Sequence, residues 1–79
     1  MKKKIVILGS TGSIGQNTLS IIKKDKINFD IKLLSTNKNV NKIINQAKEF
    51  KVKDIIISDY NKFLFAKKGN NWKNIIVEI

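Results

Sequence analysis

The sequence contains no cysteine, no histidine and no proline. Disulfides, thiol nucleophiles, soft metal sites and imidazole acid–base chemistry are therefore excluded for these residues. The acidic residues are few and scattered, with no close pair at metal-ligand spacing: Asp25, Asp30, Glu49, Asp54, Asp59 and Glu78. We interpret them as surface charges and helix caps, and we expect neither a catalytic residue nor a metal ligand within this chain.

Arginine is also absent, because all 16 basic residues are lysine, and the formal net charge is +10. Such a charge can indicate nucleic-acid binding, but nucleic-acid sites usually depend on arginine and on aromatic side chains placed for stacking. The aromatic residues here lie mostly at apolar-pattern positions that predict packing: Phe29, Phe50, Phe63, Phe65 and Trp72. Lysine, isoleucine and asparagine have codons rich in A and T, so mutational bias explains the composition. We therefore predict no nucleic-acid partner.

Long hydrophobic runs are missing as well. Lysines at positions 2–4 precede an apolar stretch that ends at Gly9, which is too short for a signal peptide. No segment approaches the length of a membrane span, so we expect no membrane association and a location in the bacterial cytoplasm. At 79 residues the chain is shorter than a typical domain, and we expect it to be marginally stable alone.

What the chain does contain is an apolar run, residues 5–8, followed by glycines at three-residue intervals and then an amphipathic stretch. This order predicts a strand, a tight turn and a helix that together bind a pyrophosphate. Gly9 would make the turn, Gly12 would let the backbone approach the phosphates, and Gly15 would let the helix pack closely on the sheet. Thr11 and Ser13 add hydroxyls that can bind phosphate oxygens.

The spacing is G-x-x-G-x-x-G rather than the standard G-x-G-x-x-G. A glycine turn that only packs a helix on a sheet, or a site for a flavin or mononucleotide, are the alternatives. The continuous apolar run predicts a strand buried on both faces of a parallel sheet. In the helix, helical spacing predicts a buried stripe at Ile14, Thr18, Ile21 and Ile22.

The end of the second expected strand bears on the choice of cofactor. NAD-binding domains place an acidic residue there for the ribose 2′-hydroxyl. This chain instead has Ser35 and Thr36, followed by Asn37, Lys38 and Asn39. Hydroxyls, amides and an ammonium would accommodate a 2′-phosphate, so we predict NADP(H) over NAD(H). Lys38 is the best candidate for that contact, and an ordinary solvated lysine is its alternative interpretation.

Strands and helices alternate along the chain, which predicts an α/β fold: a Rossmann-like parallel sheet with flanking helices, incomplete at about half of a dinucleotide-binding domain. We expect strands at about 4–8, 31–35, 54–58 and 75–77, helices at about 13–24, 40–50 and 59–68, and a turn at 69–71. Asn39 and Asp59 are N-cap candidates. In the second helix, helical spacing predicts a buried stripe at Val40, Ile43, Ile44, Ala47 and Phe50, with Gln46 on or near the solvent side. The first strand should be an unpaired edge within this chain, which is an aggregation hazard.

Two ordered motifs point to one family. The segment Gly9-Ser10-Thr11-Gly12-Ser13-Ile14-Gly15 with Thr18-Leu19, and the later Asn37-Lys38-Asn39-Val40, resemble the N-terminal segment of 1-deoxy-D-xylulose 5-phosphate reductoisomerase. Phe50 and residues 55–59 fit the same pattern. The resemblance implies cofactor contacts at Thr11, Gly12, Ser13, Ile14, Lys38 and Asn39. Asn37 stands where the family often has glycine, and Ser35 and Thr36 where it often has smaller apolar residues.

The resemblance implies an oxidoreductase of the methylerythritol phosphate pathway of isoprenoid biosynthesis. Such an enzyme rearranges 1-deoxy-D-xylulose 5-phosphate, reduces the resulting aldehyde with NADPH to 2-C-methyl-D-erythritol 4-phosphate, uses Mg or Mn, and is a homodimer. The family's metal carboxylates and substrate-phosphate site lie beyond residue 79. Residues 1–79 would then be the N-terminal part of the NADPH-binding domain, without turnover alone. Another NADP-dependent reductase, or a non-catalytic nucleotide-binding module or remnant, are the alternatives.

Overall fold

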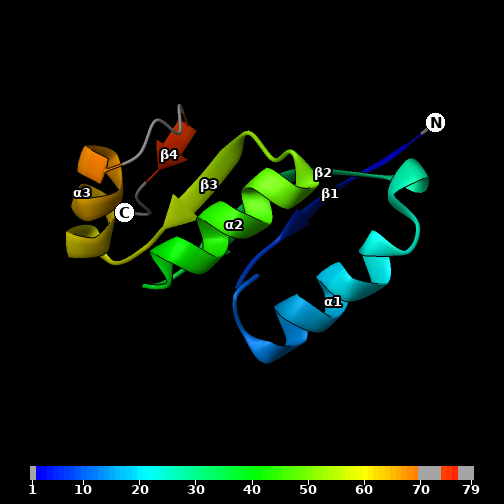
Figure 1. Cartoon of the computed structure of the whole chain (residues 1–79), viewed down its shortest axis with the longest axis horizontal. Coiled ribbons are helices and arrows are strands. Elements are labelled where there is room, and N and C mark those ends of the chain that lie inside the picture. Colours follow the sequence, from blue (N-terminus) through cyan, green and yellow to red (C-terminus); the bar gives the residue numbers. More distant parts are fainter. Residues whose placement is uncertain (1, 70–73, 77–79) are drawn as a thin grey trace.

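Four parallel strands form one open sheet in the computed structural model, which describes residues 2–69 and 74–76. Their order in the sheet follows the chain: β1 (Lys3–Ile7), β2 (Phe29–Thr36), β3 (Asp54–Ile57) and β4 (Asn74–Ile76). Three α-helices and a 3-10 turn connect them: α1 (Ser13–Lys23), η1 (Lys26–Asn28), α2 (Val40–Phe50) and α3 (Tyr60–Gly69). This architecture confirms the Rossmann-like α/β prediction (Figure 1).

The pairing register brings the carboxyl ends of the first three strands to one edge of the sheet. Ile7 is paired with Leu34, and Thr36 with Ile57. Each parallel pair needs a crossover connection, and α1 and α2 supply the first two. Among the described strands β1 lies at the edge, as predicted. The loops that leave β1 and β2 therefore start side by side.

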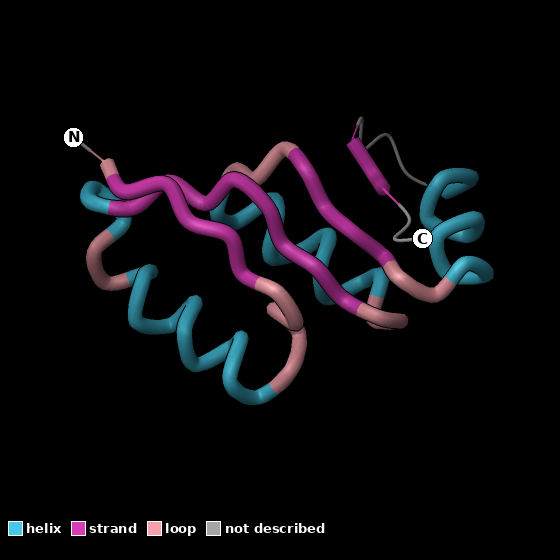
Figure 2. The backbone as a smooth tube through the Cα atoms, turned by 180° about the vertical axis from the view of Figure 1, so that it is seen from behind, coloured by secondary structure: helices cyan, strands magenta, loops and turns pink. Residues whose placement is uncertain are grey.

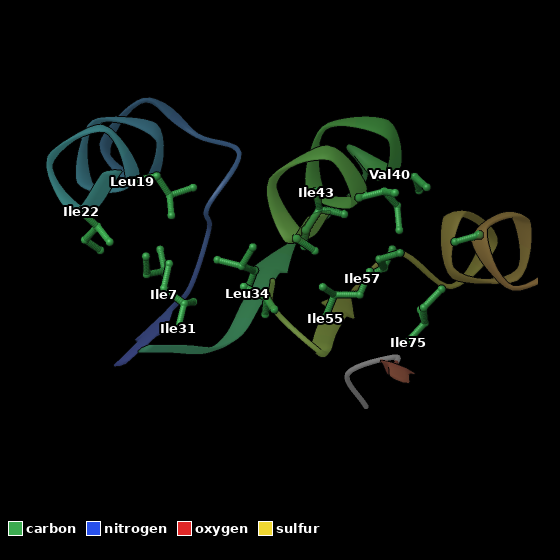
Figure 3. Packing of buried hydrophobic residues seen from close by; sticks show 14 residues of the cluster. Ile7, Leu19, Ile22, Ile31, Leu34, Val40, Ile43, Ile55, Ile57 and Ile75 are labelled. Atoms are coloured by element: carbon green, nitrogen blue, oxygen red, sulfur yellow. The ribbon is translucent and has the colours of Figure 1, made fainter. Parts of the chain in front are cut away.

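The hydrophobic core lies between the sheet and the helices that cover one of its faces (Figures 2 and 3). Leu34, Ile55 and Ile57 are fully buried on the strands. The predicted stripe of α2 packs onto them, with Val40, Ile43, Ile44 and Ala47 buried and Phe50 partly buried. Period-3.6 patterning therefore identified this face of α2 correctly.

The expectation that the first strand is buried on both faces is wrong. Ile7 is buried against α1, whereas Val6 is 55% exposed and Leu8, which lies just beyond β1, is 71% exposed. The cause is that α1 and α2 cover the same face of the sheet (Figure 3). The opposite face at β1 is left to solvent in this chain.

The predicted stripe of the first helix is only partly correct, since Ile22 is buried and Thr18 is half-buried but the two other isoleucines are not. Gly15, Leu19 and Ile22 are the buried residues of α1, whereas Ile14 is 83% and Ile21 is 69% exposed. Gly15 must lie against the backbone of the preceding turn, and that close approach fixes the rotation of the helix about its axis. The buried stripe therefore runs through Gly15, Leu19 and Ile22 rather than through Ile14 and Ile21.

The remaining differences are small. The strands were expected to end at Leu8 and Ser58, but β1 ends at Ile7 and β3 at Ile57. Helix α3 begins at Tyr60, one residue later than expected. The Asp59 carboxylate before it accepts the Lys62 N–H at 3.0 Å, as expected of an N-cap residue. Phe29, Phe50 and Phe63 pack partly buried against the core, whereas Phe65 is 61% exposed and does not join it. Trp72, Val77 and most of the predicted turn at 69–71 lie outside the described residues. Within the described part, none of the helices has the length and apolar character to cross a bilayer.

Candidate functional site

The glycine segment forms a backbone elbow at the carboxyl end of β1. Gly9 has a φ of 70°, in the left-handed region that glycine adopts without a steric penalty. Its carbonyl accepts the Gly12 N–H at 3.1 Å, which closes the turn. The side-chain amide of Gln16 also donates to the Thr11 carbonyl at 2.9 Å. These contacts turn the chain from the strand into α1 within a few residues.

The first turn of α1 has neither a capping side chain nor an acidic residue. Gly12 is the N-cap residue in extended conformation, and no side chain accepts a hydrogen bond there. The first amides of a helix have no partner within the helix, and the helix dipole adds partial positive charge at this end. Ser13 and Ile14 are exposed beside it. The arrangement fits a bound diphosphate.

The predicted roles of two glycines can be compared by placing a Cβ atom on each. At Gly15 it would lie 2.3 Å from the Gly9 carbonyl oxygen and 2.6 Å from the Ser10 Cα, so only glycine allows the helix to pack here. At Gly12 the only atom within 4 Å would be the Gly9 oxygen, at 3.5 Å. Gly15 therefore has a packing role, whereas a Cβ at Gly12 would make only one ordinary van der Waals contact.

The second candidate loop, residues 37–39, follows β2. Asn37 is held by the segment that follows β3, since its Oδ1 accepts the Ser58 hydroxyl at 2.9 Å and its carbonyl accepts the Asp59 N–H at 3.0 Å. Asn39 caps α2, with its Oδ1 accepting the Lys42 N–H at 3.3 Å, which confirms the predicted N-cap. The side chain of Lys38 is exposed at the tip of this loop.

Hydrogen bonds join the elbow to the end of β2. The Ser35 hydroxyl accepts the Gly9 N–H at 2.8 Å, and the Ser35 carbonyl accepts the Ser10 N–H at 2.9 Å. The Thr11 and Thr36 hydroxyl oxygens are 2.7 Å apart. The two loops that carry the predicted contacts are therefore neighbours, although more than twenty residues separate them along the chain.

Gln46 is part of this arrangement and sequence reasoning missed it. Its Oε1 accepts the Ser10 hydroxyl at 2.8 Å, and its Nε2 donates to the Ser10 carbonyl at 2.9 Å. Ser10 is fully buried, so α2 holds the elbow from behind. We expected Gln46 on or near the solvent side. The signal available in the sequence was its position three residues after Ile43 and directly before Ala47, which both belong to the buried stripe.

The carboxyl groups whose pKa is shifted lie away from this edge of the sheet. Asp30, near the start of β2, has its pKa lowered by a hydrogen bond from Lys32, and the pKa of Glu49, near the end of α2, is lowered by a hydrogen bond from Lys23. The described residues contain no group of three histidine, cysteine or acidic side chains that could hold a metal ion. The candidate site is thus made of backbone amides, hydroxyls, side-chain amides and one lysine.

Comparisons with known proteins point to one family. The model of the family described as 1-deoxy-D-xylulose 5-phosphate reductoisomerase matches residues 5–79. The reductoisomerase of Pelagibacter ubique is 58% identical over 66 residues, covering 84% of this chain and 17% of that protein. That of Porphyromonas gingivalis is 48% identical over 63 residues, covering 80% of this chain and 16% of that protein.

Solved structures give the same result. The reductoisomerase of Zymomonas mobilis in complex with NADPH matches with a TM-score of 0.86 at 26% identity, covering 98% of this chain and 21% of that one. A reductoisomerase in complex with NADPH, fosmidomycin and magnesium matches with a TM-score of 0.80 at 29% identity, covering 96% and 19%. The chain thus spans only about a fifth of the length of the proteins it matches.

Proposed function

The chain belongs to the 1-deoxy-D-xylulose 5-phosphate reductoisomerase family, and from this premise we propose that residues 1–79 are the N-terminal part of its NADPH-binding domain. The observation that carries the proposal is the uncapped start of α1 directly after the glycine elbow. A helix N-terminus at the carboxyl edge of a parallel sheet is where doubly wound folds bind a pyrophosphate.

We assign the pyrophosphate to the elbow. The backbone amides of Ser13 and Ile14 would donate to the phosphates, because the Gly12 N–H is already bound to the Gly9 carbonyl. Gly12 would let the backbone come close to the ligand, and the Thr11 and Ser13 hydroxyls would donate to phosphate oxygens. Gly9 and Gly15 shape the turn, because Gly9 adopts a positive φ and Gly15 carries no side chain that would prevent the close packing of the backbone there. Backbone amides and hydroxyls do not titrate near neutral pH, so these donors can bind an anion throughout that range.

We assign the 2′-phosphate to the second loop. Lys38 supplies the positive charge, and Asn37 supplies an amide group beside it. Asn39 completes the loop, with its side chain capping α2. The described residues of this loop include no carboxylate that would repel a phosphate or bind the 2′-hydroxyl of NAD. Both halves of NADPH therefore meet the residue types that suit them, at one edge of the sheet.

The complete reaction is proposed for a longer protein. In that enzyme NADPH supplies a hydride to the aldehyde formed by rearrangement of 1-deoxy-D-xylulose 5-phosphate, with Mg or Mn held by residues outside this chain, and the whole enzyme is a homodimer. Residues 1–79 would bind and orient the nucleotide only. Purified chain mixed with substrate, metal and NADPH should show no oxidation of NADPH at 340 nm.

Nucleotide titration of the 79-residue chain tests the binding assignment. We expect NADPH to bind more tightly than NADH, and Lys38→Ala to weaken NADPH binding about fivefold while leaving NADH binding unchanged, since an exposed charge-assisted hydrogen bond contributes on the order of 1 kcal/mol. Calorimetry or nucleotide fluorescence measures both affinities.

Lys24→Ala is the matched control, because it removes the same charge at the far end of α1. An equal loss of affinity in both variants would assign the effect to net charge rather than to Lys38. A chain that binds neither nucleotide would contradict the proposed function itself.

A further inference from the structure

One side chain lies between the two proposed phosphate sites and belongs to neither. Thr36, the last residue of β2, is only 4% exposed. Its hydroxyl oxygen is 2.7 Å from the Thr11 hydroxyl oxygen in the elbow and 3.3 Å from the Asn39 backbone nitrogen at the start of α2. Like most buried polar groups, the Thr36 hydroxyl is hydrogen-bonded, and its two partners lie in two different loops of the candidate site.

The direction of one of these hydrogen bonds is fixed by the groups present, and a bound phosphate would set the direction of the other. The Asn39 N–H can only donate, so Thr36 Oγ1 accepts from it. Thr36 then has its own hydrogen to donate to Thr11 Oγ1, which leaves the Thr11 hydrogen available to an outside acceptor. A phosphate oxygen can only accept, so a bound phosphate selects this direction over the reverse one.

We propose that Thr36 is a positioning residue that couples the two phosphate sites and contributes to the preference for NADPH. This inference rests on the proposed function. Its hydroxyl orients Thr11 as a donor toward the pyrophosphate and fixes the backbone of Asn39, next to Lys38. The chain of hydrogen bonds from Asn39 through Thr36 to Thr11 is polarised in one direction, which strengthens its terminal donor.

The burial of Thr36 separates this role from direct binding. A side chain that is 4% exposed presents almost no surface to a ligand, whereas Thr11 is half-buried and Asn39 is exposed. Any effect of Thr36 on nucleotide affinity must therefore pass through these neighbours. Ser35, by contrast, holds only the elbow, through Gly9 and Ser10.

The test removes the hydroxyl and keeps the shape. Thr36→Val in the 79-residue chain should weaken NADPH binding about tenfold and NADH binding about threefold, because NADPH loses both the Thr11 donor and the ordered second loop. The NADPH preference then falls about threefold. Thr36→Ser, which restores the hydroxyl, should return both affinities to within about twofold of the original.

A double-mutant cycle distinguishes positioning from a general structural effect. If Thr36 acts through Thr11, the loss of NADH affinity in the double variant Thr11→Val with Thr36→Val should be smaller than the product of the two single losses. Thr18→Val is the control, since its hydroxyl bonds only the Ile14 carbonyl within α1, and it should bind both nucleotides as the original chain does.

The outcomes separate the two proposals. If the original chain binds NADPH and Thr36→Val keeps the same affinities, or if Thr36→Ser fails to restore them, the inference about Thr36 is overturned and the proposed function stands. If the original chain binds neither nucleotide, both are overturned. Should Thr36→Val not fold by circular dichroism, Thr36→Ala removes the same hydroxyl with a smaller side chain and takes its place under the same criteria.

Discussion

The two helices that cover the sheet begin in opposite ways. α2 starts after Asn39, whose side chain accepts the Lys42 N–H and completes the helix end within the protein. α1 starts after Gly12 with no capping side chain and no acid in its first turn. Both helices follow strands that end at the same edge of the sheet, so the difference lies in the residues at the N-cap and not in the position in the fold.

That difference separates a helix end used for stability from one available for a ligand. An N-cap side chain stabilises a helix by about 1 kcal/mol. The first turn of α1 lacks this contribution, and its amides can instead bind an anion that comes from outside the chain. Substitutions at the start of one helix at a time, with stability and nucleotide binding measured for each variant, can test this difference.

The largest effect is expected at Gly15, where α1 meets the elbow. Gly15→Ala would place a Cβ atom 2.3 Å from the Gly9 carbonyl oxygen, and backbone atoms cannot move aside as a side chain can. We expect a loss of about 3 kcal/mol in the free energy of unfolding, at the upper end for overpacking. Urea unfolding followed by circular dichroism measures it.

Gly69→Ala is the matched control for this variant. A Cβ at Gly69 would meet no atom within 4 Å, so stability should stay the same or rise slightly. If Gly15→Ala were as stable as the original chain, the close approach of α1 to the elbow would be contradicted. The rotation of α1 that exposes Ile14 would then lose its explanation.

A smaller effect, with opposite signs for stability and binding, is expected at Gly12. Gly12→Asp gives α1 the cap that α2 already has, and the backbone there is extended, with a φ of −79°, which any residue adopts. Stability should rise by about 0.5 kcal/mol from capping and the helix dipole. NADPH affinity should fall at least about tenfold, because the carboxylate would occupy and repel the pyrophosphate position.

Gly12→Asn separates the two causes, since it adds a cap without a charge. It should raise stability by a similar amount and weaken NADPH binding less than the aspartate does. Gly12→Asp that binds NADPH unchanged would show that the start of α1 is not the phosphate site. The comparison between the two helices would then concern stability alone.

The order of elements and the face of α2 could be predicted from the sequence, because each depends on residues close together in the chain. The alternation of apolar runs with glycine and asparagine turns placed every helix and strand within a few residues of its observed bounds. The rotation of α1 could not be predicted in this way. Apolar residues lie on two sides of this helix, and the contact of Gly15 with Gly9 and Ser10 places Leu19 and Ile22 in the core rather than Ile14 and Ile21.

The two loops of the candidate site could be predicted for a similar reason, since glycine spacing and N-cap residues are local signals. The groups that join the loops could not. Gln46 contacts Ser10 across 36 residues and Thr36 contacts Thr11 across 25, and no periodic pattern records such pairs. Polar residues beside a buried stripe or at a strand end are the only sequence trace that these contacts leave.

The smallest effect is expected at the capped helix. Asn39→Ala removes the side chain that accepts the Lys42 N–H at 3.3 Å, a long hydrogen bond, so we expect a loss of about 0.5 kcal/mol in the free energy of unfolding. The backbone N–H of Asn39 still donates to Thr36, so NADPH affinity should change less than about twofold. Asn39→Asp keeps the cap but adds a negative charge next to Lys38, and it should lower NADPH affinity more than NADH affinity. If Asn39→Ala instead left stability unchanged and weakened NADPH binding strongly, the side chain would serve the nucleotide, and both helices would begin at the ligand.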